Sequence, residues 1–243
     1  MPEGPSLVIA KEEMSSFIGK KVIAVSGNSK IDKDRMLNKK IRDIKTWGKH
    51  LLLCFDGFTI RIHFLMFGTY YINATKDAVP RLRLEFSSGE INLYTCAVKM
   101  IEEPLDEIYD WAADVLSDAW DPKAAKKKLK AIPDTMVTDA LLDQTIFSGV
   151  GNIIKNEVLY RIKVHPKTKV GALPTKQLNA MIKEARNYSF DFLKWKKEYT
   201  LRKHWLAHTK KICDRDGDKI VKEYLGKTQR RTFFCNTCQV LYE

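Results

Sequence analysis

The hydrophobic pattern changes near residue 120, and this change constrains the fold more than any other feature of the sequence. Before it, short apolar or alternating stretches are separated by turn residues, a pattern typical of antiparallel strands. These stretches are residues 22–25, 41–46, 51–55, 59–63, 70–72, 82–86 and 91–94. After residue 120, apolar residues recur at helical spacing. The chain is therefore predicted to be α+β, with an N-terminal antiparallel β-sandwich followed by a helical part.

Helices are expected on both sides of this change. Residues 5–18 carry apolar side chains at helical spacing and predict one helix beside the sandwich. Asp56-Gly57 and Ser88-Gly89 predict hairpin turns. The second half predicts helices over residues 124–129, 136–144, 152–160 and 175–195. We expect three domains, at residues 1–115, 116–203 and 204–243, of which the last is short, basic and rich in turns.

Charge divides the chain in the same way. Residues 1–120 contain 16 Lys and Arg against 17 Asp and Glu, whereas residues 121–243 contain 26 against 13. The first half is thus near neutral, and the second half has an excess of 13 positive charges. Lys and Arg that contact phosphates release condensed counterions, so such an excess favours binding to a polyanion. A basic solvated surface without a ligand is the alternative.

Three of the five cysteines lie in the tail and predict a metal site. Cys235 and Cys238 form a Cys-x2-Cys pair, the spacing that holds two thiolates on one tetrahedral zinc ion. Cys213 supplies a third sulfur, but Asp216 stands where a second pair would have its other cysteine. The fourth ligand is therefore His208, which is slightly favoured because imidazole suits zinc, or Asp216. A hairpin without metal and with three free thiols is the alternative.

The remaining two cysteines, Cys54 and Cys96, lie in apolar stretches and are expected to be buried thiols. No apolar run approaches the roughly 20 residues that a membrane span needs. The opening Met-Pro-Glu-Gly-Pro lacks the basic and apolar regions of a secretory signal. We therefore expect no membrane partner and a cytoplasmic location of bacterial type, associated with the nucleoid.

Two further segments have weaker signals for anion binding. Gly149-Val-Gly-Asn152 precedes a predicted helix, and a glycine-rich turn at a helix start can present backbone N–H groups to an anion. Residues 226–235 form a basic, turn-rich segment that includes Arg230 and could reach phosphate. An ordinary interhelical turn and a solvated loop are the alternatives.

Taken together, four motifs resemble the formamidopyrimidine-DNA glycosylase and endonuclease VIII family of bifunctional DNA repair enzymes. They are Pro2-Glu-Gly-Pro5, Trp47-Gly-Lys-His-Leu-Leu52, the segment from Leu142 through Asn152 to His165-Pro166, and the tail Phe234-Cys-Asn-Thr-Cys-Gln239. They occur in family order over nearly the whole chain. The resemblance implies a helix-two-turn-helix domain after the sandwich, a β-hairpin zinc finger with structural Zn(II), and a monomer that binds damaged or abasic double-stranded DNA.

The resemblance also implies catalytic roles for three residues. Removal of Met1 would make Pro2 the N-terminal amine, and α-amines titrate near neutral pH, so Pro2 looks like the nucleophile that attacks C1′ of the damaged nucleotide. Glu3 looks like the acid and base that transfers protons. Lys49 matches the lysine that contacts phosphate and assists catalysis. Base loss followed by β and δ elimination would leave a one-nucleotide gap.

Five more residues are implied to contact DNA. Asn152 and Arg230 match family residues that bind phosphate at the lesion. Leu65, Met66 and Phe67 lie where members carry the side chains that fill the space left by a flipped base. From the pattern alone, this apolar run would be buried strand.

Two features favour the endonuclease VIII branch, whose members mostly act on oxidised pyrimidines. The chain begins Pro-Glu-Gly-Pro, and the stretch from Glu198 to Cys213 is short for a loop that caps an oxidised purine. The alternatives are an oxopurine (8-oxoguanine or formamidopyrimidine) glycosylase of the same family and a non-catalytic protein that binds damaged DNA. The latter would not need Pro2, Glu3 and Lys49 together.

Overall fold

The computed structural model describes residues 2–243 and divides the chain into two compact units. The first unit ends at Tyr109 and the second begins at Asp110, upstream of the expected boundary at residue 115. The difference has a physical cause, because Asp114 forms a bridge with Ser148 and Val115 is buried in the core of the second unit. The predicted helical part and the cysteine tail form one unit.

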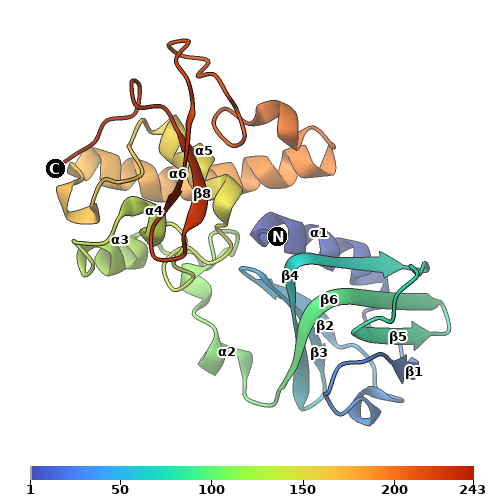
Figure 1. Ribbon diagram of the computed structural model, residues 1–243. Helices are drawn as coiled ribbons and strands as arrows, with labels where there is room; N and C mark the ends of the chain where they lie inside the picture. Colours follow the sequence, from blue (N-terminus) through green and yellow to red (C-terminus); the bar gives the residue numbers. More distant parts are fainter. Residues whose placement is uncertain (1) are drawn as a thin grey trace. The chain divides into compact units, whose positions relative to one another are not determined.

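The first unit is built on one six-stranded antiparallel sheet with the order β1-β5-β6-β4-β3-β2 (Figure 1). Its strands are β1 (Val22–Ser26), β2 (Asp43–Trp47), β3 (His50–Phe55), β4 (Phe58–Ile72), β5 (Leu82–Phe86) and β6 (Gly89–Ile101). The helices of this unit are α1 (Gly4–Met14) and α2 (Leu105–Ile108), and short 3-10 turns cover Ser15–Phe17 and Asp34–Met36.

The predicted sandwich arises because the two longest strands bend. β4 pairs with β6 through residues 59–64 and again through residues 69–72, with a register shift between Phe64 and Thr69. Thr95 in β6 has a positive φ of 49° opposite this shift. Thus β2 and β3 lie beside one half of the long pair, and β1 and β5 lie beside the other half. The two stretches predicted as separate strands at 59–63 and 70–72 are one strand.

Helix α1 packs against strands β2 and β3. Pro5 lies in the first turn, where its missing N–H costs nothing. Leu7, Ala10 and Met14 follow at helical spacing and are all buried. They join the core of the sheet, so the first residues of the chain are held at the edge of a packed layer.

The second unit contains four α-helices and a two-stranded hairpin. They are α3 (Pro122–Lys130), α4 (Val137–Ala140), α5 (Asn152–Arg161), α6 (Thr175–Lys197), β7 (Val221–Leu225) and β8 (Arg230–Phe234). Short 3-10 turns cover Trp111–Ala113, Val170–Ala172 and Leu201–His204. α5 packs on α6 and on β8, and α3 packs on α6. In the described chain, residues 2–243, no helix is long and apolar enough to cross a membrane.

One predicted helix is much shorter than its pattern. Residues 136–144 form only the single turn α4 and then a tight loop. The Gln144 side chain holds this loop, because its amide nitrogen donates to the carbonyls of Leu142 (2.7 Å) and Val150 (3.1 Å). A side chain that bonds nearby backbone in this way competes with helix formation.

Candidate functional site

The start of α1 combines an imino acid with a buried carboxylate. Pro2 is half-buried, and Glu3, the residue before the helix, is 3% exposed. The Glu3 carbonyl accepts a hydrogen bond from the Ser6 N–H at 2.8 Å, which secures the first turn. Glutamate is rarely buried without a specific role or partner. The segment therefore places a buried carboxyl group next to Pro2 in the chain.

Lys49 lies in the two-residue turn that joins β2 to β3. Trp47 pairs with His50 across this turn, and Gly48 has a φ of 53°. A positive φ at the first central position is the requirement of a type II′ hairpin turn, which glycine meets without strain. Lys49 is half-buried. α1 packs on both strands of this hairpin, and Pro2, Glu3 and Lys49 all belong to the first unit.

Two histidines lie on the strands beside this turn. His50 in β3 faces His63 in β4, and their rings meet edge to face at 5.5 Å. Burial, together with the nearby charges of Arg61 and Lys49, lowers the pKa of His50 to about 4, and burial also lowers the pKa of His63. Both rings are therefore neutral at pH 7. Arg61 and Lys49 then carry the positive charge of this region.

The residues expected to enter the DNA form an exposed apolar segment of strand β4, at its register shift. The exposed fractions of Leu65, Met66 and Phe67 are 45%, 55% and 77%. Gly68 leaves room for the neighbouring Phe64, because a Cβ at Gly68 would come within 2.8 Å of the Phe64 Cβ. Neighbouring large apolar side chains usually avoid water, so this segment is a candidate contact surface. The pattern alone predicted buried strand, and the residues do lie in a strand, but the expected burial is wrong.

In the second unit, Asn152 is the first residue of α5 and lies beside the hairpin. Its side-chain amide donates to the Arg231 carbonyl of β8 at 2.9 Å. Gln144 supports the turn that leads into α5, because its oxygen accepts from the Gly149 N–H at 3.1 Å. Arg230, at the start of β8, is half-buried. The structure thus brings the predicted residues Asn152 and Arg230 together in one unit.

Helix α5 carries three consecutive polar residues that are fully buried and that sequence reasoning missed as a network. Lys155 donates from Nζ to the Thr232 hydroxyl at 2.8 Å. The Glu157 carboxylate accepts the backbone N–H groups of residues 206, 207 and 208 at 2.8 to 3.1 Å. Asn156 bonds to His208. Such a network stabilises one arrangement of these segments, since a buried polar group that loses its hydrogen-bond partner lowers the stability of the folded protein.

The cysteine tail forms a cluster that could hold a metal ion. Ligand atoms of Cys213, Asp216, Cys235 and Cys238 all lie within 4.8 Å of one another. Two sulfurs on a tetrahedral ion with bonds of about 2.3 Å lie roughly 3.8 Å apart. The Cys213 and Cys238 sulfurs are separated by 3.8 Å, and the Asp216 Oδ2 lies 3.2 Å from the Cys235 sulfur. These distances fit tetrahedral coordination.

His208, the slightly favoured fourth ligand, lies elsewhere, and this prediction is corrected. Its Nδ1 is 3.0 Å from the Asn156 amide nitrogen, and its ring stands edge to face against Trp205 and Phe233. Burial, with the charges of Lys155 and Arg231, lowers its pKa to about 4. His208 is thus part of the buried network of α5, and Asp216 completes the cysteine cluster.

Neighbouring groups support thiolates in this cluster. The Tyr160 hydroxyl lies 3.1 Å from the Cys213 sulfur, and Arg215 donates to the Cys238 sulfur at 3.5 Å. The Arg215 guanidinium also lies over the Tyr160 ring at 4.1 Å. Burial raises the pKa of Cys235 to about 12. A cation that binds here must therefore displace a proton from that thiol.

Comparison with known proteins gives concordant results for both units. The model of the formamidopyrimidine-DNA glycosylase N-terminal domain matches residues 1–99, and that of the formamidopyrimidine-DNA glycosylase H2TH domain matches residues 111–190. Between them, they span most of the chain.

Whole-chain relatives agree with these domain matches. Endonuclease 8-like 3 of Mus musculus is 32% identical over 81% of this chain, and the match covers 34% of that protein. The chain thus spans about a third of the length of this relative. The DNA-(apurinic or apyrimidinic site) lyase Nei2 of Mycolicibacterium smegmatis is 27% identical over 82% of each protein.

A solved structure shows the same fold. The Lactococcus lactis formamido-pyrimidine DNA glycosylase, noncovalently bound to DNA containing an AP site, superposes with a TM-score of 0.86. It is 22% identical in sequence, and the match covers 98% of this chain and 99% of that chain.

Proposed function

Because this chain belongs to the formamidopyrimidine-DNA glycosylase and endonuclease VIII family, we propose that it is a bifunctional DNA glycosylase and AP lyase. It removes oxidised bases, chiefly pyrimidines, and then cleaves the strand by successive β and δ eliminations. The observation that carries this proposal is the burial of Glu3 beside Pro2, at the start of a helix that packs on the hairpin of Lys49.

The nucleophile of this proposal is the secondary amine of Pro2, which requires Pro2 to be the first residue of the mature protein. A free α-amine is partly unprotonated at neutral pH. It attacks C1′, a C1′–N bond forms, and the glycosidic bond breaks with its electron pair leaving on the base. The nitrogen lone pair then opens the sugar ring to give an iminium, and O4′ receives a proton.

Glu3 supplies that proton and later accepts others. Its buried position next to Pro2 keeps the carboxyl group near the sugar oxygen, where it serves as general acid. Loss of a C2′ proton then expels the 3′ phosphate in the β elimination. A second elimination expels the 5′ phosphate, and water releases Pro2 from the sugar fragment.

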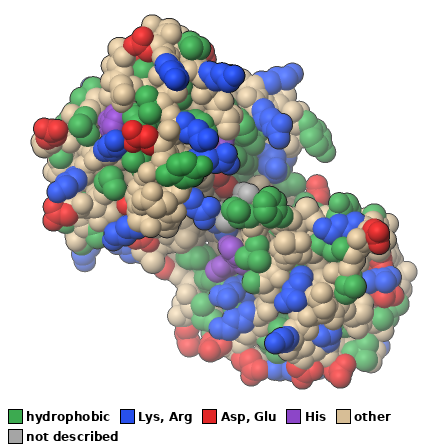
Figure 2. Space-filling model, viewed as in Figure 1, with side chains coloured by type: hydrophobic (Ala, Val, Ile, Leu, Met, Phe, Trp, Pro, Cys, Tyr) green, Lys and Arg blue, Asp and Glu red, His purple; other side chains and the backbone are tan. Residues whose placement is uncertain are grey.

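Basic and amide side chains bind the phosphates in this proposal. Lys49 is held at its turn by Gly48, and Asn152 and Arg230 lie together at the contact of α5 with β8. Leu65, Met66 and Phe67 fill the space that the extruded nucleotide leaves, since apolar side chains inserted between bases offset the cost of unstacking. The excess of Lys and Arg after residue 120 supports binding to a polyanion. Figure 2 shows that Lys and Arg side chains reach the surface of the protein.

The cysteine cluster would hold Zn(II) through Cys213, Cys235, Cys238 and Asp216. A bound ion would cross-link the ends of the β7–β8 hairpin, because Cys213 and Asp216 precede β7 and Cys235 and Cys238 follow β8. Tyr160 and Arg215 would orient two of the sulfurs. The hairpin carries Arg230 beside the start of α5.

Lesion choice separates the main proposal from its alternatives. The Pro-Glu-Gly-Pro start, the short stretch from Glu198 to Cys213 and the endonuclease 8-like relatives favour oxidised pyrimidines. An oxopurine glycosylase would share the chemistry and differ in the base pocket. A non-catalytic protein that binds damaged DNA would have no use for the Pro2 and Glu3 pair.

The test compares excision of 5-hydroxyuracil, thymine glycol and 8-oxoguanine from matched duplex and single-stranded oligonucleotides. We expect the two pyrimidine lesions to be released faster and strand cleavage to leave phosphates at both ends of the gap. Faster release of 8-oxoguanine would establish the oxopurine alternative. Binding without release of any of the three bases would contradict the glycosylase proposal.

A further inference from the structure

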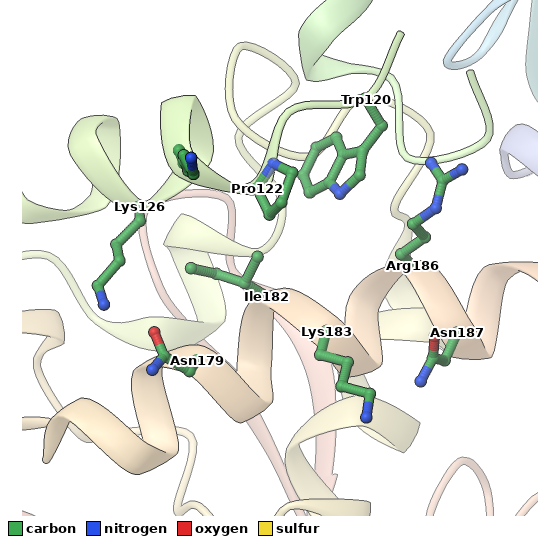
Figure 3. A pocket seen from close by; sticks show the side chains of 9 residues that line it. Trp120, Pro122, Lys126, Asn179, Ile182, Lys183, Arg186 and Asn187 are labelled. Atoms are coloured by element: carbon green, nitrogen blue, oxygen red, sulfur yellow. The ribbon is translucent and has the colours of Figure 1, made fainter. Parts of the chain in front are cut away.

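Helices α3 and α6 of the second unit enclose a pocket of about 430 Å³ that the proposed DNA chemistry does not use (Figure 3). We call it the α3–α6 pocket. Its apolar lining consists of Trp120, Pro122 and Ile182, and its polar lining of Lys123, Lys126, Asn179, Lys183, Arg186 and Asn187. None of the residues proposed to contact DNA lines it. Its volume lies within the range of sites that bind small molecules or single side chains.

The apolar part of the pocket is firmly built. Ile182 belongs to the core of the second unit and is 4% exposed. Trp120 packs on Phe147, whose ring lies 5.9 Å away, and Pro122 begins helix α3. Figure 3 shows the Trp120 and Pro122 rings facing Ile182 across the pocket. This hollow can therefore receive a bulky apolar group without rearrangement of the core.

The rim carries four cations, and no carboxylate lines the pocket. Within residues 2–243, no ion pair joins Lys123, Lys126, Lys183 or Arg186 to an acidic side chain at 4.0 Å or less. Lys128 of the same helix α3, by contrast, pairs with Asp110 at 2.6 Å. Cations without an ion pair around an apolar hollow concentrate positive potential and attract an anionic ligand.

Arg186 is held in place by the protein itself. One guanidinium nitrogen, Nη1, donates to the carbonyls of Val115 and Ser117, both at 2.9 Å, and the guanidinium carbon lies 5.1 Å from the Phe190 ring centre. The other nitrogens of its planar fork stay available for a carboxylate. A restrained cation loses little conformational entropy when it binds, which favours recognition at this position.

The charges are distributed along the pocket rather than gathered at one point. Asn179 and Arg186 are seven residues apart on α6, which is roughly 10 Å along a helix axis. In Figure 3, Lys126 and Arg186 lie at opposite ends of the pocket, with Ile182 between them. A single phosphate would be bound best by converging donors, which this lining does not offer. Separate carboxylates flanking an apolar side chain match both features.

We propose that the α3–α6 pocket docks an acidic peptide segment of a partner protein. One bulky apolar or aromatic side chain of the peptide occupies the hollow between Trp120 and Ile182. Carboxylates on either side of it pair with Lys126, Lys183 and Arg186. This interaction is independent of the glycosylase activity, since it uses none of the residues assigned to that activity.

The probe is a fluorescein-labelled peptide with one central tryptophan and three glutamates on each side, followed by fluorescence polarisation. The pocket variant is Lys126→Glu with Lys183→Glu. The control variant, Lys127→Glu with Lys194→Glu, changes the same two helices by the same charge at exposed positions outside the pocket lining. We expect the pocket variant to bind about tenfold more weakly and the control variant to bind nearly as the unchanged protein does. Replacing the tryptophan of the peptide by alanine should also weaken binding.

A second measurement does not depend on the charge variants folding. In an NMR spectrum, the indole N–H resonance of Trp120 is assigned by its absence from the variant Trp120→Phe. The peptide should shift this resonance in the unchanged protein. The proposal would be overturned if the pocket variant and the control variant lost the same affinity for the peptide, or if replacing the peptide tryptophan left the affinity unchanged. Either result would show that the peptide binds through general charge attraction. Absence of binding would overturn it as well. A single-stranded oligonucleotide that displaces the peptide and loses binding only in the pocket variant would make this a nucleic-acid site instead.

Discussion

The turn that carries Lys49 and the contact of α5 with β8 each position a residue that we propose binds phosphate, but they do so by different interactions. In the first unit, a two-residue turn with a positive φ at Gly48 positions Lys49, and the hydrogen bonds of β2 and β3 flank it. In the second unit, Asn152 bonds to the Arg231 carbonyl 79 residues away, and the helix that carries Asn152 is held by the bonds of the buried Glu157 to residues 206–208. The first arrangement is made by backbone geometry and the second by a buried polar network.

This difference has consequences for stability. A hairpin turn inside a six-stranded sheet keeps its shape when a neighbouring side chain is altered. The network of α5 is cooperative, because each buried donor or acceptor depends on a partner that cannot be replaced by water. We therefore expect a change at Pro2 to affect chemistry with little loss of stability, and changes in the α5 network to affect stability and DNA binding together.

The largest effect is expected from Pro2→Gly, which tests the first half of the comparison. Glycine leaves a primary amine in place of the restrained secondary amine, and we expect strand cleavage at an abasic site to slow by about a thousandfold or more. Single-turnover cleavage assays give this rate. Binding to an uncleavable abasic analogue should change little, and the same variant should unfold at an unchanged temperature. Full cleavage activity in Pro2→Gly would exclude Pro2 as the nucleophile.

The next effect is on the stability of the second unit. Glu157→Ala leaves three backbone N–H groups without their acceptor, so we expect the free energy of unfolding to fall by about 3 kcal/mol. Glu223→Ala is the control, because Glu223 forms an ion pair with Lys167 at 2.7 Å between partly exposed side chains and should cost under about 1 kcal/mol. Urea unfolding followed by circular dichroism gives both values. Similar losses in the two variants would show that the network is not cooperative.

Metal binding tests the assignment of Asp216 against His208. Asp216→Ala removes one of four ligands, and we expect zinc affinity to fall at least about tenfold. His208→Gln should bind zinc as the unchanged protein does, although it should be less stable because it disturbs the bond to Asn156. Competition with a chromophoric chelator measures both affinities. If His208→Gln lost more zinc affinity than Asp216→Ala, the fourth ligand would be His208 and not Asp216.

The smallest effect is a pH dependence that each unit should show separately. His50 and His208 both have a folded pKa of about 4, well below the ordinary value of 6.5. Between pH 6.5 and 4, these two histidines therefore bind protons in the unfolded chain but not in the folded units. Stability is full above pH 6.5 and falls as the pH decreases through this window, by roughly 2 kcal/mol for each histidine at pH 5.

Variants assign the two contributions. His208→Gln should reduce the pH dependence of the second unit, and His50→Gln that of the first, as followed by hydrogen exchange of amides in each unit. A loss of pH dependence in both units from one variant would show that the units unfold together.

The same comparison explains how much could be predicted from sequence. The strands, α1, α5 and α6 follow from periodicity, and the cysteine pair follows from local spacing, because each is determined by residues close in the chain. Lys49 is predicted only through the resemblance to the family. His208 was misplaced because its partner Asn156 lies 52 residues away, and sequence spacing does not reveal such a contact. The α5 network and the α3–α6 pocket were missed for the same reason. A run of Lys, Asn and Glu among apolar residues of one helix was the available signal.

The bend of β4 shows a different limit. Leu65, Met66 and Phe67 have the composition of buried strand, yet they are exposed because a register shift opposite Thr95 extrudes them. Only Gly68, whose place a larger residue could not take beside Phe64, marked the bend in the sequence. Tertiary pairing rather than local preference decides such positions.

Borohydride trapping tests the central claim most directly. The mature protein is incubated with a duplex that contains an abasic site or an oxidised pyrimidine, and borohydride then reduces any iminium to a stable amine. Gel electrophoresis and peptide mass spectrometry locate the crosslink. We predict a crosslink at Pro2 with both duplexes. Tight binding without any crosslink, in protein whose N-terminal residue is confirmed as Pro2, would contradict the account and leave a non-catalytic DNA-binding protein.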